Sequence, residues 1–222
     1  MIYMWTLRHG ELTVRCVLVS GILAALIGWA GATQSVSGVQ YRIDAAASRI
    51  ELSVYKEGIL KVFGHNHLIS AKDFSGTVYF VAGRVTDSSV TLSIEARSLT
   101  VLDPDTSEKD RHDVQETMAG AQVLDVARHE KITFRSTGVS RVKRPGNDWE
   151  VTLDGMLNLH GVEKPVTLPV RIHIENNRLH AEGEVYVLQT DFGMTPIRVG
   201  GGAVKVKDQV KISFSIVAEK TN

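Results

Sequence analysis

Two histidines with a single residue between them are the side chains of this chain whose type and spacing most directly suggest metal binding. His65 and His67 belong to the sequence Phe-Gly-His-Asn-His at positions 63–67. In an extended segment they share a face, and imidazoles so placed can bind zinc or copper if a third donor lies near. The candidates for that donor are His112, Asp113 and His129. The alternative is structural: these histidines donate hydrogen bonds to loop backbone or lie at the rim of the fold.

Motifs for enzymatic catalysis are absent from the sequence. It has no glycine-flanked serine elbow, no phosphate-binding loop and no dinucleotide fingerprint. The glycine-rich residues 199–203 lie between strand-like segments, so they are interpreted as a loop or a bend in a sheet. We therefore expect a binding protein that is not an enzyme and uses no catalytic cofactor.

Alternation of apolar and polar residues predicts the elements that would position these side chains. Ile50, Leu52 and Val54 alternate with polar or amphipathic residues, which is the period of a strand with one dry face. The pattern recurs near residues 74–81, 90–95, 132–135, 149–159, 165–175, 178–188 and 210–216. Turn residues at 143–148 and 175–178 favour hairpins. The sequence predicts about eight or nine antiparallel strands in a barrel or sandwich.

One segment departs from this rhythm. Ser107 could cap a helix that has acidic residues in its first turn, Val114 and Met118 are four residues apart, and Gly120 could end it. We predict a single helix that crosses or plugs one end of the sheet. Residues 58–67 are interpreted as a loop between strands.

The first 32 residues have the features of a secretory signal. Arg8 and Arg15 precede a nearly uncharged run at residues 16–32 that ends in Ala-Gly-Ala. We predict cleavage after Ala32, export to the periplasm or beyond, a mature domain of residues 33–222 and no stable membrane span after cleavage. A retained anchor is the alternative, because the run is nearly long enough to span a bilayer. The single cysteine, Cys16, lies before the run, so the mature domain would have neither disulfides nor thiolate metal ligands.

Charge argues against nucleic acid as a partner. The chain has 25 Lys and Arg against 25 Asp and Glu, with a pI near 7.1. Neither sign dominates, so no overall field would attract phosphate backbones or anionic surfaces.

Several phrases taken together resemble the YceI-like family of secreted polyisoprenoid-binding proteins. They are YRID at 41–44, SRI at 48–50, FSGTVYF at 74–80, ITFRST at 132–137, LHGVEKPVTL at 159–168 and DFGM at 191–194. The resemblance implies an all-β fold, a lipocalin-like antiparallel barrel of about eight strands with one helical segment. It also implies a periplasmic location and a long isoprenoid chain in the lumen.

The inward rows of such a barrel would be almost wholly apolar. The expected lumen-lining or mouth residues are Leu52, Val54, Phe63, Phe74, Val78, Phe80, Leu92, Ile94, Phe134, Leu157, Leu159, Leu168, Val170, Phe192 and Met194. A lumen of this kind would suit a hydrocarbon chain, since an unpaired hydroxyl or amide buried there would be costly. A core filled by its own side chains is the alternative.

The expected function is therefore that of a periplasmic protein that sequesters or carries a polyisoprenoid or isoprenoid quinone. The alternative is a metal- or haem-linked accessory protein that uses His65 and His67. Strands near an open edge would also permit a homodimer.

Overall fold

The computed structural model describes residues 37–57, 66–199 and 204–221, and the predicted signal peptide lies outside these ranges. The strands are β1 (Val39–Ile43), β2 (Arg49–Glu57), β3 (His67–Ala71), β4 (Phe74–Phe80), β5 (Ser89–Glu95), β6 (Leu99–Val101), β7 (Lys131–Lys143), β8 (Trp149–Leu159), β9 (Val162–Glu175), β10 (Arg178–Leu188), β11 (Arg198–Val199) and β12 (Val204–Lys220). The helices are α1 (Glu108–Ala119) and the 3₁₀ turns η2 (Val85–Asp87), η3 (Ala96–Ser98) and η4 (Gln189–Phe192).

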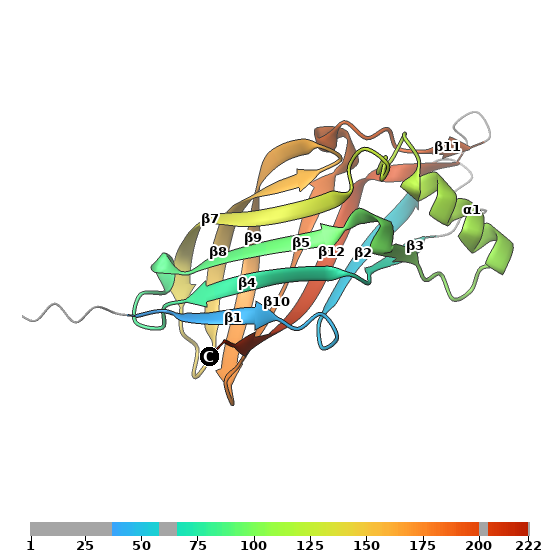
Figure 1. Cartoon of the computed structure of the whole chain (residues 1–222). Coiled ribbons are helices and arrows are strands. Elements are labelled where there is room, and N and C mark those ends of the chain that lie inside the picture. Colours follow the sequence, from blue (N-terminus) through green and yellow to red (C-terminus); the bar gives the residue numbers. More distant parts are fainter. Residues whose placement is uncertain (1–36, 58–65, 200–203, 222) are drawn as a thin grey trace, which may run out of the picture. The chain divides into compact units, whose positions relative to one another are not determined.

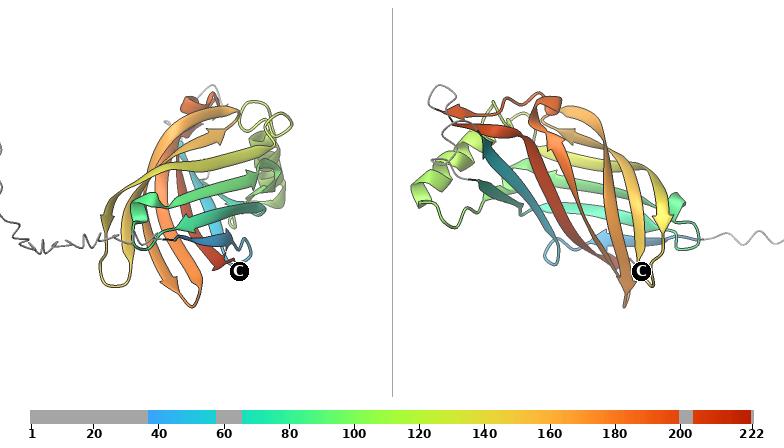
Figure 2. Two further views of the ribbon diagram at one scale, coloured as in Figure 1. Left: turned by 60° about the vertical axis from the view of Figure 1, so that its left-hand side comes forward. Right: turned by 180° about the vertical axis from the view of Figure 1, so that it is seen from behind.

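Eight of these strands close into an antiparallel barrel (Figures 1 and 2). Their order around the ring is β1-β4-β5-β7-β8-β9-β10-β12, and β12 pairs back to β1. The predicted barrel is thereby confirmed. Because the ring is closed, every strand in it has a hydrogen-bonded neighbour on each of its two edges.

The last strand, β12, has two successive partners along one edge. Residues 205–215 pair with β2, and residues 218–220 pair with β1. β2 then carries β3 and β6 outward as an extension of the sheet, while β11 pairs with the start of β12. This branching explains why the described sheet has twelve strands when only eight of them close the barrel.

Two tight hairpins depend on residues in the left-handed region. Asn176 and Asn177 have φ of 51° and 63° between β9 and β10, as expected for a two-residue turn of this type. His160 and Gly161 have φ of 53° and 74° between β8 and β9. Asparagine adopts this conformation readily, whereas histidine does so less often.

The predicted helix and its cap are confirmed. The hydroxyl of Ser107 accepts a hydrogen bond from the backbone N–H of Asp110 at 3.1 Å, and α1 ends before Gly120. The side chain of Gln115 joins α1 to β6: its Oε1 accepts from Val101 N at 2.9 Å, and its Nε2 donates to Leu99 O at 2.8 Å. Among the described residues, no helix combines the length and apolar character needed to cross a bilayer.

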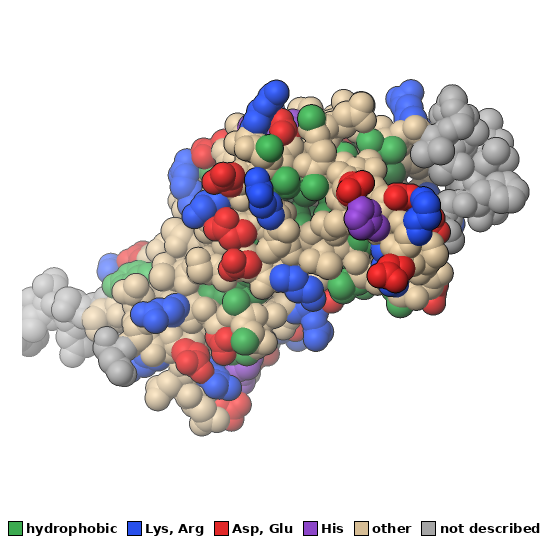
Figure 3. All heavy atoms as spheres, turned by 45° about the vertical axis from the view of Figure 1, so that its right-hand side comes forward, with side chains coloured by type: hydrophobic (Ala, Val, Ile, Leu, Met, Phe, Trp, Pro, Cys, Tyr) green, Lys and Arg blue, Asp and Glu red, His purple; other side chains and the backbone are tan. Residues whose placement is uncertain are grey.

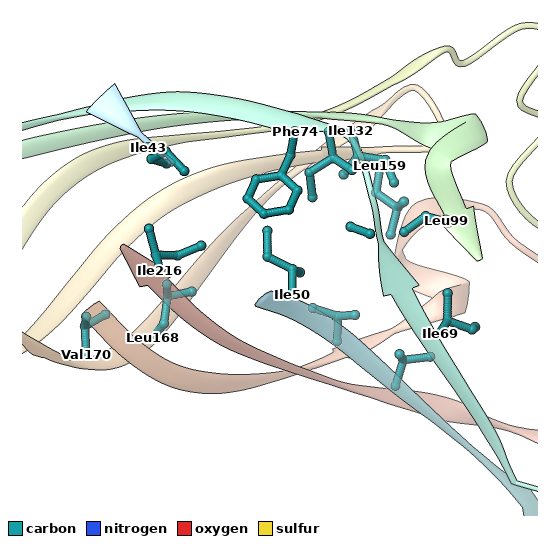
Figure 4. Packing of buried hydrophobic residues seen from close by; sticks show 14 of the residues in the cluster. Ile43, Ile50, Ile69, Phe74, Leu99, Ile132, Leu159, Leu168, Val170 and Ile216 are labelled. Carbon is teal, nitrogen blue, oxygen red and sulfur yellow. The ribbon is translucent and has the colours of Figure 1, made fainter. Parts of the chain in front are cut away.

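The interior is built from the inward row of each strand. Figure 4 shows Ile43 of β1, Ile50 of β2 and Ile216 of β12 near Leu168 and Val170, which both belong to β9. On the outside, acidic and basic side chains are interspersed, as Figure 3 shows for one face. The mixed charge agrees with the balanced composition.

Candidate functional site

An apolar cavity of about 200 Å³ lies inside the barrel. Every ring strand contributes to its wall, because alternate residues of each strand point inward. Only two of the described residues on this wall are polar, Ser88 and Ser89, which adjoin η2. Ser88 uses its hydroxyl to accept a hydrogen bond from Val81 N at 3.0 Å. The cavity therefore offers no charged group, and its only described hydroxyls are those of Ser88 and Ser89 beside η2.

Most residues expected in the lumen lie on this wall. They are Leu52, Val78, Phe80, Leu92, Ile94, Phe134, Leu157, Leu159, Leu168 and Val170. Leu153 and Ile172, from the same alternating rows, also line it. Local periodicity was sufficient to find these positions, since it fixes which residues share a face.

Of the other expected residues, those that the structure describes do not line the cavity. Val54 is partly buried beside it, and Phe74 is buried at the start of β4, with its ring directed towards Ile50 in Figure 4. Phe192 and Met194 are buried in η4 and the turn that follows it. Phe63 lies outside the described residues. Phe74 therefore packs as core where the sequence suggested a lumen residue, and Phe192 and Met194 pack as core where it suggested a mouth.

A second group of wall residues was not anticipated as lining. It includes Ile43 and Ile50 from the first two strands, and residues of β10 and β12: Leu179, Ala181, Val185, Ile212, Phe214 and Ile216. The same alternation marks the last six, so the signal was present. The pairing that makes β10 and β12 neighbours in the ring, and so places both rows on the same wall, is not local information.

Two inward glycines shape the cavity. A Cβ on Gly155 would lie 2.3 Å from the ring of Phe134, and a Cβ on Gly183 would lie 2.7 Å from the ring of Phe214. Each aromatic ring thus lies across a strand position without a side chain. Because both rings also line the cavity, these glycines allow the rings to lie flat against the wall.

Of the three histidines of the metal hypothesis, the structure describes His67 and His112, and these two contact different acidic residues. His67 Nδ1 lies 2.6 Å from Oδ2 of the buried Asp103, whose Oδ1 accepts from Leu68 N at 2.7 Å. His112 is exposed on α1, with its Nε2 3.8 Å from Glu116 Oε1. His65 lies outside the described residues, so the site that was suggested from His65, His67 and His112 stays a prediction.

The comparison with a known family agrees with the sequence resemblance. The family model described as a YceI-like domain matches residues 41–218. Protein YceI of Salmonella arizonae is 28% identical over 171 residues, which cover 73% of this chain and 80% of that protein. A UPF0312 protein of Pectobacterium atrosepticum is 30% identical over 140 residues, and the matched region spans 62% of this chain and 64% of that protein's length.

Solved structures share the fold at low sequence identity. Burkholderia cenocepacia BcnA superposes with a TM-score of 0.61 at 21% identity, covering 79% of this chain and 98% of BcnA. A domain from Saccharophagus degradans that is described as polyisoprenoid-binding gives a TM-score of 0.58 at 15% identity, covering 82% of this chain and 99% of that domain. The barrel is therefore the fold of these proteins.

Proposed function

Because the match over residues 41–218 shows that this chain belongs to the YceI-like family, we propose that it binds the tail of a polyisoprenoid or isoprenoid quinone inside its barrel. The protein would sequester or carry this lipid and perform no chemistry on it. In support, the similar domain from Saccharophagus degradans is described as polyisoprenoid-binding.

The apolar wall is the observation that carries this proposal. A methylene group that leaves water for such a wall contributes about 0.8 kcal/mol, so a branched hydrocarbon can bind tightly without a hydrogen bond. A sugar, nucleotide or peptide would leave its polar groups unpaired beside Leu92, Phe134 and Leu168, at a cost of roughly 1–3 kcal/mol for each group.

The size of the cavity limits how the lipid binds. About 200 Å³ exceeds the ~150 Å³ that holds a benzene-sized ligand but is below the ~300–1,000 Å³ of most ligand pockets. A long tail must therefore widen the lumen by rotamer changes of wall residues. The headgroup would remain at a mouth, because the described wall has no charged group and only the hydroxyls of Ser88 and Ser89.

Transport across the periplasm is the biological setting that we propose. It depends on the signal-like residues 1–32, which would export the chain to the compartment between the two membranes. A protein there could shield an isoprenoid tail from water on its way between membranes. The homodimer stays a prediction.

Binding can be tested with prenyl quinones of increasing tail length. The protein, delipidated with organic solvent and refolded, should bind them with an affinity that rises with each enclosed isoprene unit and levels off when the lumen is full. The solvent extract of freshly purified protein, analysed by mass spectrometry, should contain an isoprenoid. An affinity independent of tail length, together with an extract free of isoprenoids, would contradict the proposal.

A matched pair of variants tests whether the lumen is the binding site. Val166→Phe places a larger ring on the cavity wall, whereas Val142→Phe makes the same change at a side chain that is 38% exposed. We expect Val166→Phe to weaken quinone binding at least tenfold and to cost about 1–3 kcal/mol of folding stability through overpacking. Val142→Phe should bind like the unmodified chain. Equal binding by the two variants would place the lipid elsewhere.

A further inference from the structure

Three segments that are distant in sequence meet beside the β8–β9 hairpin. They are the irregular residues 120–130 that follow α1, the turn at His160 and Gly161, and η4 with the residues after it. Thr195 N donates to Gln122 O at 3.1 Å, and His160 Nδ1 lies 3.1 Å from the carbonyl oxygen of Phe192. Asp125, His129 and His160 come together at this junction.

Each of these three residues offers one donor atom within 4.8 Å of the others. Among the residues that the structure describes, they are the one group of at least three histidine, cysteine or acidic side chains with this spacing. The imidazole rings of His129 and His160 pack edge to face with their centroids 4.8 Å apart. The two rings are therefore already neighbours, with a carboxylate beside them.

The hydrogen bond of His160 leaves a nitrogen free for a metal ion. A carbonyl oxygen can only accept, so Nδ1 of His160 carries the proton that it donates to Phe192, and the ring lone pair lies on Nε2. A backbone carbonyl in this role is the usual second partner of a metal-bound histidine, since it fixes the tautomer and the ring orientation.

The carboxylate of Asp125 is nearly buried, and its ion pair with Arg128 is long and exposed to solvent. Its side chain is 11% exposed, and the nearest cation is Arg128, whose Nε lies 3.5 Å from Oδ2. The Arg128 side chain is 80% exposed, so it can move into solvent when a cation binds. Asp125 thus holds a negative charge beside two imidazoles.

The backbone at the junction places the two rings in contact. His160 and Asp125 both adopt positive φ, 53° and 43°, which is uncommon for residues other than glycine and asparagine. Gly161 has no side chain, and a Cβ there would lie 2.5 Å from Cε1 of His129. The turn therefore presents His160 and at the same time leaves room for the His129 ring.

We propose that Asp125, His129 and His160 bind one divalent transition-metal ion, with Zn²⁺ as the fitting species. Two imidazole nitrogens and a carboxylate oxygen are a common zinc ligand set, and water would complete a tetrahedron. Zn–ligand bonds of about 2.0–2.1 Å put tetrahedral donors about 3.4 Å apart. The donor atoms here would approach one another by about 1.4 Å at most, within reach of side-chain rotation.

Such an ion would add a link between segments that are distant in sequence. Residues 120–130 and the β8–β9 turn would share the metal, and η4 would be held through the His160 bond to Phe192. Metal binding should therefore raise the melting temperature, and above the Kd the increase should follow the logarithm of the free Zn²⁺ concentration. This inference does not depend on the proposed lipid.

The test uses the untagged full chain, stripped with a chelator and dialysed against Zn²⁺. We expect one tightly bound zinc per chain, and at least a tenfold weaker affinity in Asp125→Asn and in His160→Asn. Asparagine tolerates positive φ, so both variants preserve the backbone. His180→Asn and His67→Asn are controls for the other described histidine sites and should bind zinc like the unmodified chain.

Co²⁺ provides a second readout that does not depend on stability. A tetrahedral site with two histidines should give intense visible d–d absorption in the unmodified chain and lose it in Asp125→Asn. If His160→Asn fails to fold, Asp125→Asn and this spectrum decide the question. The proposal is wrong if zinc does not bind, if both junction variants bind it normally, or if His67→Asn or His180→Asn is the variant that removes it.

Discussion

At the scale of single residues, His173 shows how an outward position acquires a defined charge. The alternation in β9 predicts that it faces outward, and the structure agrees, with its side chain 41% exposed. Its Nδ1 lies 2.7 Å from Asp148 Oδ1, its Nε2 lies 3.6 Å from Glu175 Oε2, and the ring of His180 is nearby on β10. The hydrogen bond to Asp148, with a further contribution from Glu175, raises the pKa of His173 above 6.5.

This raised pKa gives a prediction with a definite sign. Protonated His173 favours the folded state, so its contribution is complete below about pH 6.5, the value in the unfolded chain, and is lost as pH rises through the higher folded-state pKa. An NMR titration of the His173 ring should show a midpoint above 6.5, and Asp148→Asn should lower it. An unchanged His173 midpoint in Asp148→Asn would show that Asp148 is not the cause.

Residue types and spacing reveal lumen positions far better than they reveal the junction of Asp125, His129 and His160. Leu92 and Phe134 could be assigned to the lumen because successive side chains of a strand point to opposite faces, so the short stretch around each residue predicts its direction. His129 and His160 are separated by 31 positions, and only the turn between β8 and β9 brings the second to the first. A pattern of neighbouring residues therefore cannot predict that these two histidines are in contact.

At the scale of elements, α1 was predictable with its ends because capping is local chemistry. Ser107 and Gly120 flank it as expected. Four short strands, β1, β3, β6 and β11, were not predicted, since a strand of two to five residues has too few positions to show alternation. They exist because a longer neighbour pairs with them, which is a property of the assembled sheet.

The contact between α1 and β6 gives the prediction for this scale. Gln115 supplies both an acceptor for Val101 N and a donor for Leu99 O, so its amide satisfies the outer edge of β6 much as another strand would. Gln115→Leu removes both hydrogen bonds and should cost about 1–3 kcal/mol of folding stability. Chemical denaturation measures this cost, and hydrogen exchange at the Val101 amide should become faster.

Glu116→Leu is the matched control for this prediction. Its side chain is 72% exposed on the same helix, so the change should alter stability by no more than about 0.5 kcal/mol. Equal losses in the two variants would point to helix propensity or solubility as the cause, and would exclude the contact with β6.

At the scale of the whole molecule, closure was the feature least accessible to residue-by-residue reasoning. Alternating strands are equally compatible with a sandwich, and only the family resemblance favoured a barrel. In the structure closure depends on β12, which leaves β2 after the Arg49–Ser215 pair and joins β1 at the Ile43–Ala218 pair. Between these pairs the backbone of β12 has no strand residue opposite it on this edge, although its other edge pairs with β10.

Ser48 fills this gap, and it supplies the prediction for the barrel as a whole. Its hydroxyl accepts from Val217 N at 2.9 Å and donates to Asp44 O at 2.6 Å, while Asp44 N donates to Val217 O at 2.9 Å. Ser48→Ala would leave the largely buried Val217 N–H without its acceptor, at a cost of about 1–3 kcal/mol.

Because the missing bond lies at the seam that closes the ring, the loss should not stay local. Hydrogen exchange should accelerate at Val217 and also along β1, whose pairing with β12 begins one residue further on. Ser75→Ala makes the same change at an exposed position in β4 and should leave both stability and exchange within about 0.5 kcal/mol of the unmodified chain. Faster exchange at Val217 alone, with β1 unaffected, would show that the ring closes without help from Ser48 and that strand pairing by itself determines the barrel.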